Sequence, residues 1–227
     1  MRPKRIELVF GKIEYLNLLP FHVFMKRFMR HNALKQSMEH YKSVPAKIND
    51  KFARRRVEAA FISSINSRKC RRPKLGIIAK EEVKSVLCLP KFPDQNDAES
   101  ATSNVLAKVL NLQGKILIGD KALRYALEHD DYIDMAKLWH ERTHLPFVFA
   151  TLCFHKKNSL AKKLETMFAK QSGHIKIPQY LLKKASAKSC VPPKEILSYL
   201  ELIEYAFDAK SRKSLHIFLN KAKRKYL

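Results

Sequence analysis

Acidic residues are scarce in this sequence, and so are glycine, cysteine and long apolar runs. Its 227 residues include 21 Asp and Glu against 45 Lys and Arg, which gives a formal net charge of +24. Such an excess predicts an anionic partner, either nucleic acid, an anionic surface or a small acidic substrate. The basic residues are spread along the chain with no RNA-recognition motif, so we interpret most as solvated surface and expect no specific nucleic-acid partner.

No apolar stretch approaches the length of a membrane span, so we expect no transmembrane segment. The first residues, MRPKR, are followed at once by a short amphipathic run that contains Glu7. A secretory signal would have a longer apolar core at this place. We therefore expect a cytoplasmic protein.

The cysteines are few, widely separated and without a C-x-x-C pair. This spacing indicates neither a structural zinc site nor a disulfide framework. We therefore expect reduced thiols and no metal site. The four cysteines are Cys70, Cys88, Cys153 and Cys190.

Alternating strand-like and helix-like runs predict an α/β protein. The hydrophobic fraction of 46% suits a chain that buries one large core or two small ones. Strands separated by helices predict a mostly parallel sheet with helices on its faces, followed by a helical C-terminal segment. The expected strands are 6–10, 41–44, 59–62, 75–79, 86–89, 115–119 and 147–152. The expected helices are 21–28, 45–57, 100–112, 120–128, 134–143, 160–171, 178–188, 193–207 and 211–226.

The stretch EYLNLLPF, residues 14–21, places an amide between leucines just after an apolar run. Gly11 permits a bend, and Pro20 suits the first turn of a helix, so the segment is typical of a strand, a turn and a helix start. Asn17 then lies near the carboxyl end of a strand, where open α/β sheets place ligands. An ordinary helix cap or turn residue is the alternative.

Hydroxyl side chains gather at two other element ends. Ser100, Thr102 and Ser103 precede a leucine-bearing helix, where hydroxyls and free backbone N–H groups can hold a small anion. Ser63 and Ser64 end the strand over 59–62. Simple helix capping explains the first group equally well, and for Ser63 and Ser64 it is the interpretation that the residues alone favour.

Six segments in order resemble the chorismate dehydratase family of the futalosine route to menaquinone. They are residues 11–20, 60–65, 83–87, 100–103, 118–123 and 138–150. The related naphthoate synthase of the same route usually has Ser-Pro-Cys-Pro-Asn-Asp at the first turn, where this chain has Tyr-Leu-Asn-Leu-Leu-Pro.

The resemblance implies a fold like that of type II periplasmic binding proteins, with two α/β domains and a ligand cleft between them. The first domain would contain residues 1–86 and 150–227, and the second residues 87–149. Crossing strands would lie near 85–89 and 149–154, and the helical C-terminal segment would pack back on the first domain.

The resemblance also implies a hydro-lyase that converts chorismate to 3-[(1-carboxyvinyl)oxy]benzoate without a cofactor. Asn17 and Ser85 would orient the reacting groups, and one of them would assist the departing hydroxyl. The enolpyruvyl carboxylate of the substrate is a plausible intramolecular base, because the strongest motifs contain no histidine or glutamate in an obvious base position. The residues expected to bind the two substrate carboxylates are Ser63, Ser64, Ser100, Thr102 and Ser103.

Other functions remain open at this point. A cytosolic binding protein for small carboxylates would have the same fold, and 1,4-dihydroxy-6-naphthoate synthase belongs to the same pathway. A nucleic-acid-binding protein is favoured by the positive charge alone.

Overall fold

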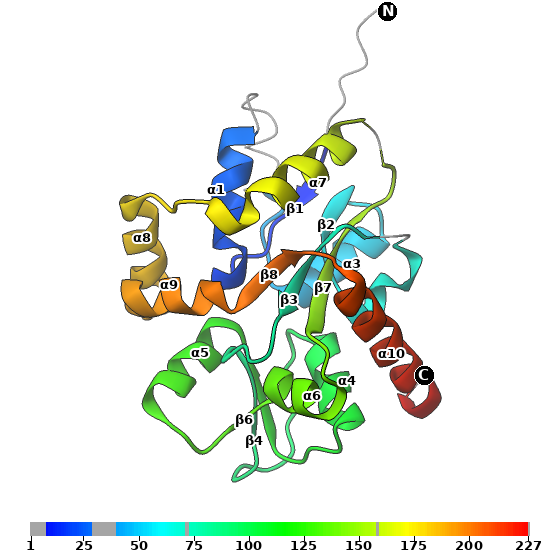
Figure 1. Cartoon of the computed structure of the whole chain (residues 1–227), viewed down its shortest axis with the longest axis vertical. Helices are drawn as coiled ribbons and strands as arrows, with labels where there is room; N and C mark the ends of the chain where they lie inside the picture. The colour runs from blue at the N-terminus through cyan, green and yellow to red at the C-terminus, as the bar shows by residue number, and fades with distance from the viewer. Residues whose placement is uncertain (1–7, 29–39, 71–72, 158, 227) are drawn as a thin grey trace, which may run out of the picture.

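The strands of the computed structural model, which describes residues 8–28, 40–70, 73–157 and 159–226, form two sheets (Figure 1). The larger has the order β1-β2-β7-β3-β8 and the smaller the order β5-β4-β6. The strands are β1 Phe10–Gly11, β2 Ala59–Ser63, β3 Leu75–Ala79, β4 Val86–Leu89, β5 Lys115–Ile118, β6 Ile133–Asp134, β7 Phe147–Phe154 and β8 Ile203–Ala206.

Helices cover both sheets. The α-helices are α1 Leu19–Phe28, α3 Pro45–Ala53, α4 Ala101–Val109, α5 Gly119–Glu128, α6 Met135–Thr143, α7 Ser159–Gln171, α8 Gln179–Ser189, α9 Pro193–Glu201 and α10 Ala209–Tyr226. Short 3₁₀ helices lie at η1 Leu16–Leu18, η2 Ser64–Lys69 and η3 Ser172–His174. The predicted α/β class with two units is confirmed by the two sheets, whereas the proposed domain boundaries stay a prediction.

The expectation of a mostly parallel sheet is wrong. Only the β1–β2 pair is parallel among the paired strands that the structure describes. The chain leaves the larger sheet after β3, builds the smaller sheet, and returns through β7 between β2 and β3. Because β7 runs in the direction opposite to β2 and β3, it pairs antiparallel with both of them.

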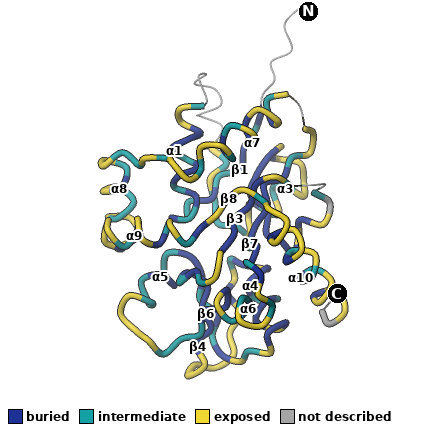
Figure 2. The backbone as a smooth tube through the Cα atoms, in the orientation of Figure 1, coloured by how far each residue is buried: buried dark blue, intermediate teal, exposed yellow. Residues whose placement is uncertain are grey.

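Aromatic side chains form the centre of the core between the larger sheet and the helices α1 and α7. The ring of Phe21 on α1 contacts Phe61 of β2 and Phe168 of α7, edge to face, with both centroid distances at 5.0 Å. This confirms the predicted apolar face of the first helix, where Phe24 and Met25 are also buried. Figure 2 shows the buried strands at the centre and the exposed positions on the outer helices.

The C-terminal segment is not purely helical. The helix expected over 193–207 ends at Glu201, and the next residues form β8 at the edge of the larger sheet. The alternating burial of β8, with Ile203 and Tyr205 inside, is the strand pattern that the helical prediction missed. The last helix, α10, also contacts the second unit, because Trp139 on α6 donates a hydrogen bond to Ser214 at 3.0 Å.

Two smaller strand predictions also differ from the structure. Residues 41–44 form no strand, although Lys42 makes an isolated bridge with Lys12. Of the strand expected over 6–10, residues 6 and 7 lie outside the described residues, and β1 begins only at Phe10.

One disulfide bond contradicts the prediction that all thiols are reduced. Cys70, which follows η2, is bonded to Cys153 on β7 across a sequence separation of 83 residues. Their Cα atoms are 5.5 Å apart, a separation that disulfides commonly span and that residue spacing cannot reveal. Cys88 and Cys190 are free. None of the helices in the described ranges is long and apolar enough to cross a membrane.

Candidate active site

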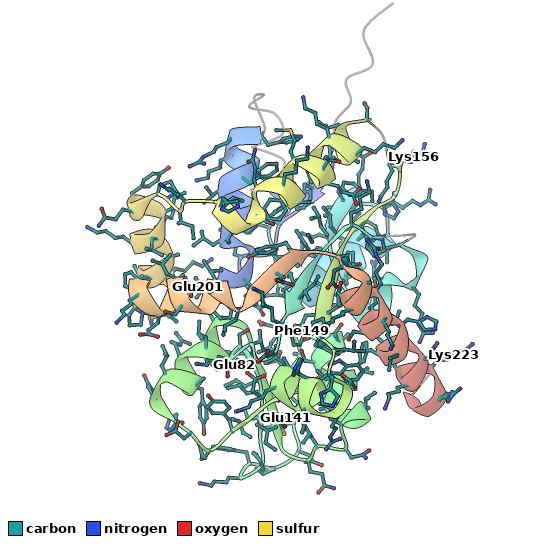
Figure 3. All side chains as sticks on the ribbon, viewed as in Figure 1. Glu82, Glu141, Phe149, Lys156, Glu201 and Lys223 are labelled. Carbon is teal, nitrogen blue, oxygen red and sulfur yellow. A yellow bond between two sulfur atoms is a disulfide. The ribbon has the colours of Figure 1, made fainter. Side chains whose placement is uncertain are left out.

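A small cavity lies where the two sheets meet, and side chains from both units line it. Phe61 and Phe149 come from the larger sheet, and Ile118 comes from the smaller one. Figure 3 shows the labelled Phe149 between the two units. Five of the residues predicted for the site line this cavity, namely Asn17, Ser63, Ser85, Ser100 and Ser103.

The 3₁₀ turn η1 holds Asn17 at the cavity wall. The neighbours Leu16 and Leu18 are buried, and the backbone carbonyl of Asn17 accepts a hydrogen bond of 2.6 Å from the hydroxyl of Tyr205. These contacts fix the backbone of Asn17. Its side-chain oxygen Oδ1 is buried and has no partner among the described residues. Neither a cap nor a turn uses this oxygen, which leaves it available to a ligand.

Ser85 is buried and its hydroxyl lies 2.9 Å from the phenol oxygen of Tyr199 on α9. Burial raises the pKa of Tyr199 well above its usual range, although hydrogen bonds from Ser85 and Asn17 act in the opposite direction. Tyr199 therefore stays protonated and links the two predicted catalytic residues. No sequence pattern pointed to Tyr199, because nothing in a C-terminal helix indicates that one of its side chains contacts a turn more than a hundred residues earlier.

The turn before Ser85 is held by Asp134, the residue that caps α6. Its Oδ2 accepts hydrogen bonds from the backbone N–H groups of Val83 and Lys84, at 2.8 and 2.6 Å. Burial raises the pKa of Asp134, and its hydrogen bonds with backbone N–H groups oppose this rise. Lys84 has a φ of 55°, so the turn is conformationally demanding and depends on this support. Sequence reasoning identified neither role for Asp134.

Ser100 and Ser103 form one small network at the start of α4. The Ser100 hydroxyl accepts a hydrogen bond of 3.1 Å from the backbone N–H of Ser103 and donates one of 2.8 Å to the Ser103 hydroxyl. Ser100 is thus the N-cap, and Ser103 keeps a hydroxyl proton to donate. Thr102 does not line this cavity, because its Oγ1 points to the other side and accepts from Ile65 N at 3.3 Å.

The two serines at the end of β2 have different surroundings. Ser63 lines the cavity while its Oγ accepts a hydrogen bond of 2.8 Å from Asn49 Nδ2, so its own proton is available. Ser64 does not line the cavity and donates instead to the backbone oxygen of Val148 at 2.6 Å. Ser63 is the last residue of β2 and Ser64 the first of η2, so the change of backbone direction between them separates the two side chains. Ser64 and Thr102 thus lie outside the wall of this cavity, and their expected contact with a ligand stays a prediction.

Tyr15 closes one side of the cavity and connects the two units. Its hydroxyl donates a hydrogen bond to Glu99, and its ring packs on Gly119, where an added Cβ would lie 2.9 Å from the ring. Gly119 also has a φ of +68°, so a larger residue there would be strained. Burial, followed by the contact with Glu99, raises the pKa of Tyr15. Beside it, Asp120 Oδ1 accepts a hydrogen bond of 3.0 Å from Leu16 N, which joins α5 to η1.

The wall of the cavity is mostly apolar, with hydroxyl and amide groups among the apolar side chains, and it carries no formal charge in the part of the chain that the structure describes. It offers hydroxyl and amide donors, the N-terminus of α4 and several apolar faces. Such a wall can hold and orient a small carboxylate, whereas it supplies no strong side-chain base. In residues 8–28, 40–70, 73–157 and 159–226, no three His, Cys, Asp or Glu side chains lie close enough to hold a metal ion.

Comparison with known proteins gives consistent results. A family model described as menaquinone biosynthesis matches residues 102–224. A chorismate dehydratase of Campylobacter jejuni subsp. jejuni, serotype O:23/36, is 41% identical over 220 residues, which cover 95% of this chain and 98% of that protein.

Two solved structures are similar in shape but distant in sequence. A crystal structure of an Archaeoglobus fulgidus protein superposes with a TM-score of 0.66 at 12% identity, covering 95% of this chain and 96% of the other. A Candida albicans protein, described as having the generic periplasmic binding protein fold, gives a TM-score of 0.47 at 11% identity, with 97% and 91% covered. The fold class of this chain rests on its own two sheets.

Proposed function

The chain belongs to the chorismate dehydratase family of menaquinone biosynthesis, and we propose that it removes water from chorismate in the cavity beside Asn17. The product would be 3-[(1-carboxyvinyl)oxy]benzoate, and the enzyme a hydro-lyase. The identity of 41% extends over nearly the whole of both proteins, so the two units and the cavity between them are included in the similarity.

The observation that supports this site most strongly is the buried Oδ1 of Asn17, which has no partner in the described residues. A buried polar atom without a partner costs free energy, about 1–3 kcal/mol, unless a ligand or water satisfies it. Asn17 faces the same cavity as the hydroxyl groups of Ser63, Ser85 and Ser103. A substrate with two carboxylates, a ring hydroxyl and an ether oxygen has the groups that such a cavity can bind.

The start of α4 would hold one carboxylate of chorismate. The Ser103 hydroxyl and the helix N-terminus both favour negative charge there, and Ser100 fixes the local geometry. Ser63 would donate to the other carboxylate from the opposite wall. These assignments account for binding without a cationic side chain in the cavity wall.

The reaction then needs a base that removes the proton, a group that assists departure of the hydroxyl, and a fixed geometry of the bound substrate. The enolpyruvyl carboxylate of chorismate would take the proton from the ring carbon that bears the ether oxygen, since no side chain of the wall is a strong base. The resulting electron pair forms the ring double bond as the C–O bond to the hydroxyl breaks. The protonated carboxyl group gives that proton to the departing hydroxide, which leaves as water, and the carboxylate is restored. Asn17 would orient the ring, and Ser85, fixed by Tyr199, would hydrogen-bond the departing oxygen.

The proposal is tested by incubating purified protein with chorismate and following the aromatic enol ether by chromatography and mass spectrometry. We expect the product to form without added cofactor. Ser85→Ala should lower turnover strongly, whereas Ser64→Ala is a matched control, because Ser64 is an equally buried serine that does not line the cavity. Absence of product with the unaltered protein, or equal effects of the two substitutions, would contradict the proposal.

A further inference from the structure

A second and larger cavity, of about 330 Å³, lies on the other side of Tyr15, between α1 and α8. Both helices are seen on the left of Figure 1. The volume is within the usual range of small-molecule sites, about 300–1,000 Å³. Tyr15 lines both cavities, and no other residue is shared by the two walls in the described ranges. The proposed dehydration does not use this second cavity.

The cavity wall on α1 is one continuous stripe. Leu19, His22, Val23 and Lys26 are spaced by three, one and three residues, which places all four on the same face of a helix. The stripe is apolar at Leu19, where the helix begins, and it ends at the exposed side chain of Lys26. Lys26 has no ion-pair partner among the described residues.

The wall on α8 repeats the pattern. Leu181, Lys184, Ala185 and Lys188 have the same spacing, and all four line the cavity. Lys184 is exposed and, in the described part of the chain, makes no ion pair. The two helices therefore present matching faces, apolar within and basic at the rim, to one partly open cavity. An ordinary solvated helix surface does not combine these features with a cavity.

The third wall is the segment before η1, where Glu14 meets three lysines. Glu14 forms ion pairs with Lys12 at 3.3 Å, with Lys42 at 2.8 Å and with Lys188. Although burial raises the pKa of Glu14, the hydrogen bonds from Lys188 and Lys42 dominate and lower the pKa to about 2. Three lysines around one carboxylate therefore leave an excess of positive charge at this wall.

His22 provides an independent observation. Its Nε2 is buried and has no partner among the described residues, although the residue lines the cavity. Burial lowers the pKa of His22 to about 3, and the charges of Lys12, Lys26 and Lys188 act in the same direction. The imidazole is thus neutral at physiological pH, with an unused hydrogen-bonding atom beside the cavity. Like the Oδ1 of Asn17 in the first cavity, it indicates a site built for a polar ligand.

We propose that this second cavity binds a small organic acid, with its carboxylate at the lysine rim and its apolar body between α1 and α8. The lysines supply charge complementarity for the anion. Leu19, Val23 and Leu181 supply the apolar contacts that an inorganic anion could not use. The site is separate from the dehydration cavity, and the inference holds whatever reaction occurs there.

Benzoate is a suitable probe, because it combines one carboxylate with a small apolar body. We expect saturable shifts of the methyl NMR signals of Leu19, Val23 and Leu181 when benzoate is added to the full chain. Shifts confined to Ile77 and Ile118, which line the first cavity, would overturn the proposal. Inorganic phosphate at equal ionic strength should bind more weakly, and equal binding would refute the apolar part of the site.

Two double variants test the lysine rim. Lys26→Gln with Lys184→Gln removes two charges from the cavity wall and should weaken benzoate binding about tenfold. Arg27→Gln with Lys183→Gln removes two charges from exposed positions on the same helices that do not line the cavity, and should leave binding unchanged. Equal weakening in both variants would show only a general charge effect and would refute the site.

Turnover of chorismate at saturation is measured on the same variants. We expect the Lys26 and Lys184 variant to keep its turnover, since neither residue lines the first cavity. An inactive protein that still binds benzoate at α1 and α8 would contradict the proposed function and support this site. An active protein that does not bind benzoate at α1 and α8 would support the proposed function and contradict this site.

Discussion

Substitution of Asn17 by alanine is the most direct test of the chemistry proposed for the first cavity. The Oδ1 of Asn17 has no partner among the described residues, so the alanine variant loses only the hydrogen bond between the Asn17 side chain and Tyr199. The backbone contact from Tyr205 does not depend on the side chain. We therefore expect the free energy of unfolding to change by no more than about 1 kcal/mol.

The effect on turnover should be much larger. A hydrogen bond to a charged group contributes about 1.5–3 kcal/mol, and loss of orientation of a reacting group costs a comparable amount. A loss of about 2.7 kcal/mol in the transition state corresponds to a rate about a hundredfold lower. Turnover measured at saturating chorismate should fall by this factor or more. Asn17→Asp, which keeps the shape but removes the amide donor and adds charge, should also be impaired at neutral pH.

A substrate analogue separates the role of Asn17 from that of the base. A chorismate analogue without the enolpyruvyl carboxylate lacks both the proposed base and one anchoring anion, so even the unaltered enzyme should convert it very slowly. Occupancy must be measured directly, and turnover compared at saturation. Normal dehydration of the bound analogue would show that a protein side chain is the base. Full activity of Asn17→Ala would return Asn17 to the role of an ordinary turn residue.

Four further predictions concern other parts of the molecule. The ordinary pKa of histidine is 6.5 and that of His22 is about 3, so between these values the unfolded chain binds a proton that the folded chain does not. Stability should therefore fall as the pH is lowered through this window, by up to about 1.4 kcal/mol per pH unit, and thermal melts of His22→Leu should show a shallower decline. Tyr199→Phe should lower kcat about tenfold with little change in KM, because Ser85 loses its hydrogen-bond partner. If Tyr199→Phe lowered kcat by the same factor in the wild-type protein and in the Ser85→Ala variant, this coupling would be refuted. Cys70→Ser should lower the free energy of unfolding by roughly 2–5 kcal/mol in denaturant titrations, whereas substitution of the free Cys190 should not. Exhaustive chelation should leave chorismate turnover unchanged, and loss of activity restored by one divalent ion would contradict the proposed chemistry.

Local pattern was sufficient for most elements. The apolar spacing around Phe21 predicted α1, and the β-branched and small residues over 59–62 predicted β2, because these signals depend only on neighbours along the chain. The motif around Asn17 and the serine cluster at residue 100 also led to cavity-lining residues, since element ends are where polar side chains collect. Family membership was recognisable from the same segments.

Other features were decided only by packing in three dimensions. Strand direction followed from the return of β7 between two earlier strands, and the disulfide followed from the approach of Cys70 to that same strand. Pairing between distant segments leaves no local pattern, so the sequence alone could predict neither the strand direction nor the disulfide.

The separation of Ser63 from Ser64 and the contact of Tyr199 with Ser85 have the same origin. Sequence determined which hydroxyl groups were available near element ends. Only the tertiary structure decided which of them face the cavity, because a side chain's direction is set by the strand or turn that carries it and by the partner that packs against it.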